Sequence, residues 1–146
     1  MLKNVMKAVK EALQQVPELR YAGEDWGQLD YFRQSPVKFP CALVDVEAVD
    51  YSDNGARYQQ GIGSLTVRVA DSRMFNGSFQ APPSDTEFAA FDLLQSVYKA
   101  LQGLSGETFS PLTRTKLVRA RRDDSIREFR LSFDFAFTDP DAGRRR

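Results

Sequence analysis

The 146-residue sequence contains no histidine and a single cysteine, Cys41. Histidine is the commonest general base, the commonest transition-metal ligand and the usual partner of a nucleophilic serine or cysteine. One cysteine excludes an intrachain disulfide and a metal site built from several thiolates. An enzyme of this composition would depend on carboxylates, Lys, Tyr or Arg. We therefore expect a protein that is not an enzyme, with no catalytic, metal-binding or cofactor-binding residues.

Long apolar segments are also missing. No run approaches the ~20 apolar residues that cross a bilayer, and residues 1–4 lack the apolar core of a signal peptide. The length fits one ordinary domain. We expect a cytosolic product without a membrane partner, with a single α+β domain over residues 1–138 and a disordered basic tail over 139–146.

Charge is unevenly distributed along the chain, although the net charge is zero. Residues 1–110 carry 10 Lys and Arg against 14 Asp and Glu, a balance of −4, and residues 111–146 carry 10 against 6, a balance of +4. An acidic body followed by a basic C-terminal hairpin favours ordered contact between copies, or a local basic surface, over general nucleic-acid binding.

Two stretches have the apolar spacing of amphipathic helices. The first runs over residues 2–16, with lysines opposite its apolar stripe, and ends at Pro17. The second is predicted over 86–101 and is opened by the capping box of residues 84–87. Its buried stripe is expected to comprise Phe88, Phe91, Leu94, Val97, Tyr98 and Leu101.

The remaining periodic patterns predict strands. Residues 20–22 and 29–32 are weak candidates. A hairpin is predicted from residues 42–49 and 58–70, because Asn54-Gly55 between them favours a tight turn. Its expected inward residues are Ala42, Val44, Val46 and Ala48 in the first strand, and Leu65, Val67 and Val69 in the second.

A second hairpin joins residues 113–121 to a last strand in which apolar and polar residues alternate without a break. In that strand we expect Phe129, Leu131, Phe133, Phe135 and Phe137 to face inward, and Glu128, Arg130, Ser132, Asp134 and Ala136 to face water. The whole pattern predicts an α+β fold, an antiparallel sheet of two long hairpins with two helices packed on one face and a polar opposite face.

Motifs that carry chemistry are scarce. Gly61-Ile62-Gly63 lacks the third glycine and the following helix of a dinucleotide site. The adjacent acids Asp123-Asp124 lie between arginines in a predicted turn, where a solvated, self-neutralising tip is the simpler interpretation than a metal pair. Cys41 at a strand start is expected to be an inert buried thiol.

The basic C-terminal hairpin is the one charged constellation with a functional interpretation. Its basic residues are Arg114, Lys116, Arg119, Arg121, Arg122, Arg127 and Arg130. Three interpretations stay open: a hairpin whose arginines keep it solvated, a surface that forms ion pairs with the acidic body of another copy, and a lining that faces DNA.

The connection over residues 71–83 is long for a compact domain, and such connections are usually functional or disordered. It contains Met74, Phe75 and Phe79. Exposed aromatic residues reduce solubility unless something covers them. The connection is therefore either a partner-binding loop or a flap folded onto its own core.

Sheet edges give the positive argument for assembly. A sheet of two long hairpins has unpaired rims that must be covered, charged or joined to a neighbour. Copies of one chain that pair head to tail can close into a ring.

The order of these elements resembles the tail terminator and tail-completion proteins of long-tailed bacteriophages. The matching features are the helix over 2–16, residues 39–46 leading into the first long strand, the helix over 86–101 between two hairpins, and residues 121–124 leading into the aromatic strand 129–137. The resemblance spans about residues 1–138. The 71–83 connection is where the pattern does not align.

The resemblance implies a virion protein of the tail, assembled in the bacterial host cytoplasm, with no cofactor. It implies a homo-oligomeric ring, a hexamer, that caps the tail tube, stops its polymerisation and docks the head. The partners would be the tube protein and the head–tail connector proteins, with at most passive contact with DNA in the lumen. Met74, Phe75 and Phe79 would then contact a neighbouring subunit or the tube, and Arg114, Lys116, Arg119 and Arg121 the lumen or the subunit seam.

Other interpretations predict different behaviour. A head-closure or neck adaptor and a tail tube subunit share similar architecture, and a tube subunit would form tubes where a terminator forms discrete rings. A small enzyme without histidine would show a ligand in a pocket lined by Asp45, Glu47 or Arg68. A nucleic-acid-binding module would bind with an affinity that falls steeply with salt.

Overall fold

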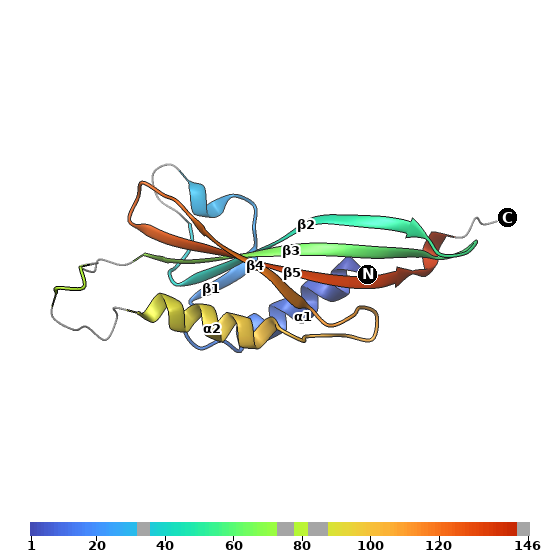
Figure 1. The fold of residues 1–146 in the computed structure, drawn as a ribbon, viewed down its shortest axis with the longest axis horizontal. Helices are drawn as coiled ribbons and strands as arrows, with labels where there is room; N and C mark the ends of the chain where they lie inside the picture. The colour runs from blue at the N-terminus through green and yellow to red at the C-terminus, as the bar shows by residue number, and fades with distance from the viewer. Residues whose placement is uncertain (32–35, 73–77, 82–87, 143–146) are drawn as a thin grey trace.

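A computed structural model gives the fold and describes residues 1–31, 36–72, 78–81 and 88–142. The elements in chain order are α1 (Leu2–Gln14), β1 (Tyr21–Glu24), the 3-10 turn η1 (Gln28–Asp30), β2 (Cys41–Asp53), β3 (Gln59–Ser72), α2 (Ala89–Leu101), β4 (Thr113–Ala120), β5 (Ile126–Asp139) and the 3-10 turn η2 (Pro140–Ala142). Figure 1 shows an elongated molecule, with the tip of the β2–β3 hairpin at one end and residues 78–81 at the other.

The α+β class expected from the sequence is confirmed, but the sheet is not two simple antiparallel hairpins. The strand order is β1-β2-β3-β5-β4. β2–β3 and β4–β5 form hairpins, and β3 pairs antiparallel with β5 between them. β1 adds a parallel edge strand beside β2. Parallel neighbours require a crossover connection, and residues 25–40 supply it. Within that connection residues 28–30 form η1, so the strand predicted over 29–32 is wrong there.

The main hydrophobic core lies between the two helices and one face of the sheet (Figure 1). Val5, Val9 and Leu13 of α1 are buried in it, and so are Ala90, Leu93, Leu94, Val97 and Leu101 of α2. All the residues predicted to face inward from β3 and β5 are buried in this core. Each fully buried side chain of this size contributes about 1.5–3 kcal/mol of hydrophobic stabilisation.

Two glycines of β3 accept aromatic rings from β5. Gly61 lies opposite Phe137 and Gly63 lies opposite Phe135 in the register. A Cβ atom at either glycine would lie 2.5 Å from an atom of the facing ring. Gly61-Ile62-Gly63 therefore has a packing role, because only glycine leaves room for a ring directly across the strand pair.

The second face of the sheet is not uniformly polar, contrary to the prediction. Leu29 and Val37, from the crossover, pack with Cys41, Leu43 and Ala70 in a second buried cluster. The crossover covers this face because it must carry the chain past the sheet to reach β2 in the same direction as β1.

A bulge in β2 reverses its alternation. The register with β3 shifts between Val46 and Ala48. Ala48, predicted to face inward, is exposed, and Val49 packs on the core instead. One extra residue on one strand exchanges the two faces for every residue after it, because side chains alternate with period two.

Candidate functional site

β4 is exposed on both of its faces. The seven residues from Thr113 to Arg119 are all exposed. Leu117 is 50% exposed and Val118 is 41% exposed, and adjacent strand residues point to opposite faces. β5 pairs with one edge of β4, and within the described residues no strand pairs with the other. At the start of this edge the Arg114 N–H donates to Gln102 Oε1 at 2.8 Å. The rest of the edge, with apolar residues on both faces, is suited to being covered by another protein surface.

The four basic residues predicted at the lumen or the subunit seam, Arg114, Lys116, Arg119 and Arg121, all lie on or beside β4. Arg114 and Arg119 lie on its helix side, with their guanidinium carbons 3.8 Å from the ring centroid of Tyr98 and 5.8 Å from that of Phe129. Lys116 lies on the opposite side, across from Ser132. Arg121 follows the strand and is exposed. The structure therefore brings the candidates to one sheet edge but divides them between its two faces.

A row of aromatic rings runs from the 78–81 segment to the sheet. The ring centroids of Phe79 and Phe88 lie 6.5 Å apart, those of Phe88 and Phe91 lie 6.3 Å apart, and those of Phe91 and Phe129 lie 5.9 Å apart. Phe79 is 83% exposed, and Phe88 and Phe91 are each 52% exposed. We call Phe79, Phe88 and Phe91 the aromatic row.

The aromatic row corrects the sequence prediction that Phe88 and Phe91 are buried. Phe88 occupies the position just before the first residue of α2, where its side chain makes no capping hydrogen bond. Phe91 reaches the sheet only through the ring of Phe129, at the edge of the core. Ala90 and Leu93 fill the inward positions of this turn. Of the predicted contact residues, Met74 and Phe75 lie outside the described residues, as does the capping box over 84–87.

The opposite edge of the sheet is acidic. β1 pairs only with Cys41–Val44 of β2, and within the described residues no strand pairs with this side of residues 45–53. This stretch carries four acids and neither Lys nor Arg: Asp45, Glu47, Asp50 and Asp53. Burial, and then repulsion from Asp25, Glu47 and Glu24, raises the pKa of Asp45 above its ordinary value. The edge therefore gathers four carboxylates on one strand.

Glu128 corrects a second prediction. It was expected to face water, but its side chain is completely buried. Arg68 donates to it from Nε and Nη2, both at 2.9 Å. Arg122 and Arg130 also donate to it, at 2.8 and 2.7 Å. Burial acts to raise the pKa of Glu128, but hydrogen bonds from the three arginines outweigh it and lower the pKa to about 2.

The same arginines connect three parts of the chain. Arg68 also reaches Asp30 at 3.1 Å, and Arg122 reaches Asp30 at 2.9 Å and Asp124 at 2.8 Å. Hydrogen bonds to these carboxylates raise the pKa of Arg122 and lower that of Asp124. The cluster fastens the crossover and the β4–β5 turn to the sheet. Sequence reasoning missed it because nothing in the pattern indicates that the crossover covers this face.

The described residues offer little for catalysis. The charges of the buried cluster are engaged in ion pairs with one another, so none is poised as a free acid or base. Burial raises the pKa of the Cys41 thiol to about 12, which suppresses the reactive thiolate. Within the described ranges no group of acids or cysteine has an arrangement that could hold a metal ion. No described helix is long and apolar enough to span a membrane.

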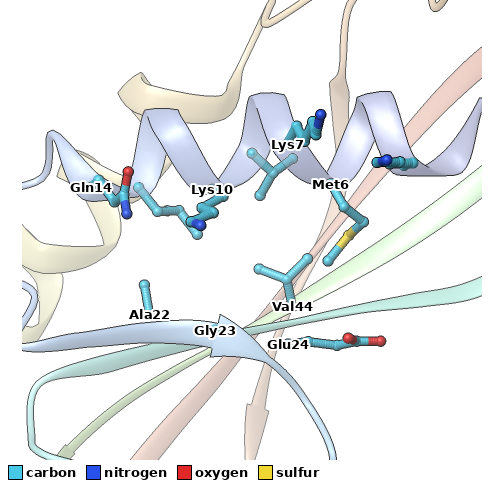
Figure 2. Close-up of a pocket in the computed structure, with 11 residues that line it drawn as sticks. Met6, Lys7, Lys10, Gln14, Ala22, Gly23, Glu24 and Val44 are labelled. Atoms are coloured by element: carbon cyan, nitrogen blue, oxygen red, sulfur yellow. The ribbon is translucent and has the colours of Figure 1, made fainter.

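A pocket of about 380 Å³ lies between α1 and the β1 edge. Figure 2 shows Met6 of α1 and Val44 of β2 pointing toward each other across it. Lys3, Lys7, Lys10 and Glu24 supply its charged groups. The predicted enzyme signature, a pocket lined by Asp45, Glu47 or Arg68, is not this pocket, because none of those three residues lines it.

Comparison with known proteins identifies the fold but no family. No protein-family model matches the chain, and no curated protein does. Among solved structures, the chain is similar to one described as "Virion of native gene transfer agent (GTA) particle". The two chains are 14% identical, the TM-score is 0.58, and the likeness covers 92% of this chain and 94% of that one. At this identity the comparison establishes a shared fold.

Proposed function

We propose that this chain is a structural virion protein that acts as a tail terminator of a phage-like particle. Copies would form a ring, a hexamer, that caps the tail tube, stops its polymerisation and presents the head-docking face. The observation that carries this proposal is β4, a strand exposed on both faces, in a fold shared almost end to end with a chain of a gene transfer agent virion. Such a strand is suited to burial in an assembly.

The chemistry of the chain supports an assembly role over catalysis. The chain contains no histidine, and burial raises the pKa of the Cys41 thiol to about 12. Glu128 and Asp30 pair with Arg68 and Arg122 in a cluster that holds the fold together. A mechanical protein needs a rigid body with exposed contact surfaces. The core and the charged cluster supply the first, and β4 and the aromatic row supply the second.

Within the ring, the exposed groups have natural roles. The aromatic row offers an apolar contact for a neighbouring subunit or the tube, together with Met74 and Phe75 of the same connection. Arg114, Lys116, Arg119 and Arg121 would line the subunit seam or the lumen, where contact with DNA is passive. The tube protein and the head–tail connector proteins are the expected partners, and the tail of the virion is the expected location.

Electron microscopy of the purified full-length chain, alone and with preformed tail tubes, tests this function. A terminator gives discrete rings, or tubes with one end capped and no further elongation. Tubes built from this chain alone would instead identify a tube subunit, and rings that bind heads but not tubes would identify a neck adaptor. A chain that neither forms rings nor binds tubes or heads would refute the proposal.

A further inference from the structure

The two open edges of the sheet carry opposite charge. The acidic edge is residues 45–53 of β2, with four carboxylates and no cation, and the basic edge is the outer side of β4 (Thr113–Ala120), with Arg114, Lys116 and Arg119 and no acid. Unpaired strand edges recruit further strands unless something prevents it. The charges decide which strands they recruit, because like charges across an interface repel and opposite charges attract.

Symmetric pairing is disfavoured on both edges. Two acidic edges would bring eight carboxylates together, twice the four of one copy, and two basic edges would oppose their cations. Pairing of the acidic edge with the basic edge of another copy relieves both. Because such a contact joins two different surfaces of one chain, it can repeat from copy to copy and close into a ring.

The lengths and directions of the two edges agree. β2 has 13 residues, of which four pair with β1, which leaves nine for the acidic edge. β4 has eight, and the N–H of one of them, Arg114, already donates to Gln102 Oε1. β2 is antiparallel to β3, β3 to β5 and β5 to β4, so β2 and β4 run in opposite directions. A continuous sheet from one copy to the next therefore joins the two edges as antiparallel neighbours.

The pairing also shifts each copy along the strand direction. Within one copy, β4 lies level with the first half of β2, with β5 and β3 between them. Ala120 of β4 pairs with Glu128 of β5, Glu128 pairs with Ala70 of β3, and Ala70 pairs with Cys41 of β2. The acidic edge is the second half of β2. Copies joined in this way are staggered, and a closed sheet requires stagger because its strands tilt relative to the axis.

Both faces of the two strands match in chemistry. Leu117, opposite Leu131, faces the helix side, as do Val46 and Val49 of β2, opposite Leu65 and Gly63. Lys116 and Asp45 both face the other side of the sheet. This follows from the register, in which Lys116 pairs with Ser132, Ser132 with Thr66, and Thr66 with Asp45. The pairing would therefore place apolar residues together on the helix side and Lys116 near carboxylates on the polar side.

We propose that β4 of one copy pairs antiparallel with the acidic edge, residues 45–53, of the next copy, and that this seam joins the copies of the ring. The inference rests on the proposed function in that a ring is assumed, and it adds which surfaces form the seam. Burial, and then repulsion from Asp25, Glu47 and Glu24, raises the pKa of Asp45, and the arriving cations would relieve that repulsion.

Charge reversal on each edge tests the seam in the full-length chain. One variant carries Asp45→Lys, Glu47→Lys and Asp50→Lys, and the other carries Lys116→Glu and Arg119→Glu; all five positions are exposed. Self-association is measured by sedimentation velocity over a concentration series, with electron microscopy of the same samples and thermal unfolding to confirm folding. Each variant alone should associate roughly tenfold or more weakly than the wild type, because its two edges now carry the same charge.

Mixing the two variants should restore association. The reversed β2 edge of one variant then meets the reversed β4 edge of the other, and the two unreversed edges meet as in the wild type. General attraction between oppositely charged chains is controlled by a second pair of variants at exposed positions outside β2 and β4. One carries Glu11→Lys, Asp92→Lys and Glu107→Lys, and the other carries Lys3→Glu and Lys99→Glu. Each control variant alone should associate like the wild type.

Failure of the seam and failure of the proposed function give different results. If both edge variants still form rings like the wild type, the seam is wrong and the ring stands. If the mixture fails to regain association while each variant is folded, the seam is also wrong. A wild-type chain that stays monomeric at every concentration would overturn the proposed seam in the free protein. The terminator function is then tested separately, by whether the chain caps tail tubes in electron micrographs.

Discussion

Arg68 and Glu128 form a bidentate ion pair across β3 and β5, with the Nε and Nη2 atoms of the arginine each 2.9 Å from a different carboxylate oxygen. The Glu128 side chain is fully buried and that of Arg68 is 9% exposed. Asp30 shares the same guanidinium at 3.1 Å. The pair therefore fixes the crossover to the sheet, in addition to linking two strands that already pair through their backbones.

Replacing Arg68 by Leu should reduce the free energy of unfolding by about 3 kcal/mol, because removal of one partner leaves a buried charge poorly compensated. Arg130→Leu is the matched control. Arg130 donates to the same carboxylate, but its side chain is 48% exposed, so its loss should cost about 1 kcal/mol or less. Urea unfolding followed by circular dichroism measures both. Equal losses in the two variants would contradict the distinct role of Arg68.

Stability should fall as the solution is acidified below pH 4.5. Glu128 has an ordinary pKa of 4.5 in the unfolded chain and about 2 in the folded one. Because the folded carboxylate binds a proton less readily, its contribution is fully present above pH 4.5 and is lost as the pH falls toward 2. The contribution is about 3 kcal/mol.

The variant Glu128→Gln separates this effect from general acid unfolding. Its free energy of unfolding, from urea titrations between pH 7 and pH 2.5, should start lower than that of the wild type and fall less with acid. Asp124→Asn serves as a control. The pKa of Asp124 is also lowered, but its side chain is 42% exposed, so its removal should change the pH profile less. An unchanged profile in Glu128→Gln would refute the assignment.

Gly63→Ala should destabilise the protein by about 1–3 kcal/mol, the cost of overpacking a filled core. The new Cβ would lie 2.5 Å from a ring atom of Phe135. That ring cannot move away without disturbing its stacking on Phe137, whose ring centroid lies 6.0 Å from its own. Gly23→Ala is the control, because its Cβ would meet Tyr21 at 3.4 Å. Thermal and urea unfolding should place Gly23→Ala near the wild type, and a neutral Gly63→Ala would show that the ring can move.

The parts of the fold that followed from the sequence are those decided by local periodicity. The alternation from Phe129 to Phe137 identified β5 and its inward face correctly, because a strand against a core must place every second side chain in it. The 2–16 helix followed from its apolar stripe for the same reason. Neither assignment depended on where the rest of the chain lies.

The parts that failed depend on distant segments. Glu128 and Asp134 occupy equivalent polar positions in the pattern of β5, yet the first is buried and the second is exposed. The difference is the crossover, which lies over one end of the sheet face. The faces of β2 after Val46 were misassigned because the bulge adds a residue that no composition signal marks. Phe91 has the spacing of the apolar stripe of the helix, but at its position α2 lies over the edge of the core, where only the ring of Phe129 contacts it.

The aromatic row should contribute to assembly and little to stability. Phe79→Ser and Phe88→Ser remove rings that are 83% and 52% exposed, so each should change the free energy of unfolding by about 0.5 kcal/mol or less. If the row contacts a neighbouring subunit or the tube, the double variant should cap tubes less well or associate more weakly. Phe129→Ala is the opposite control, since that ring is buried and its loss should cost about 3–5 kcal/mol. Urea unfolding and tube cosedimentation measure the two effects separately, and a stable double variant that binds tubes like the wild type would remove the row from the assembly surface.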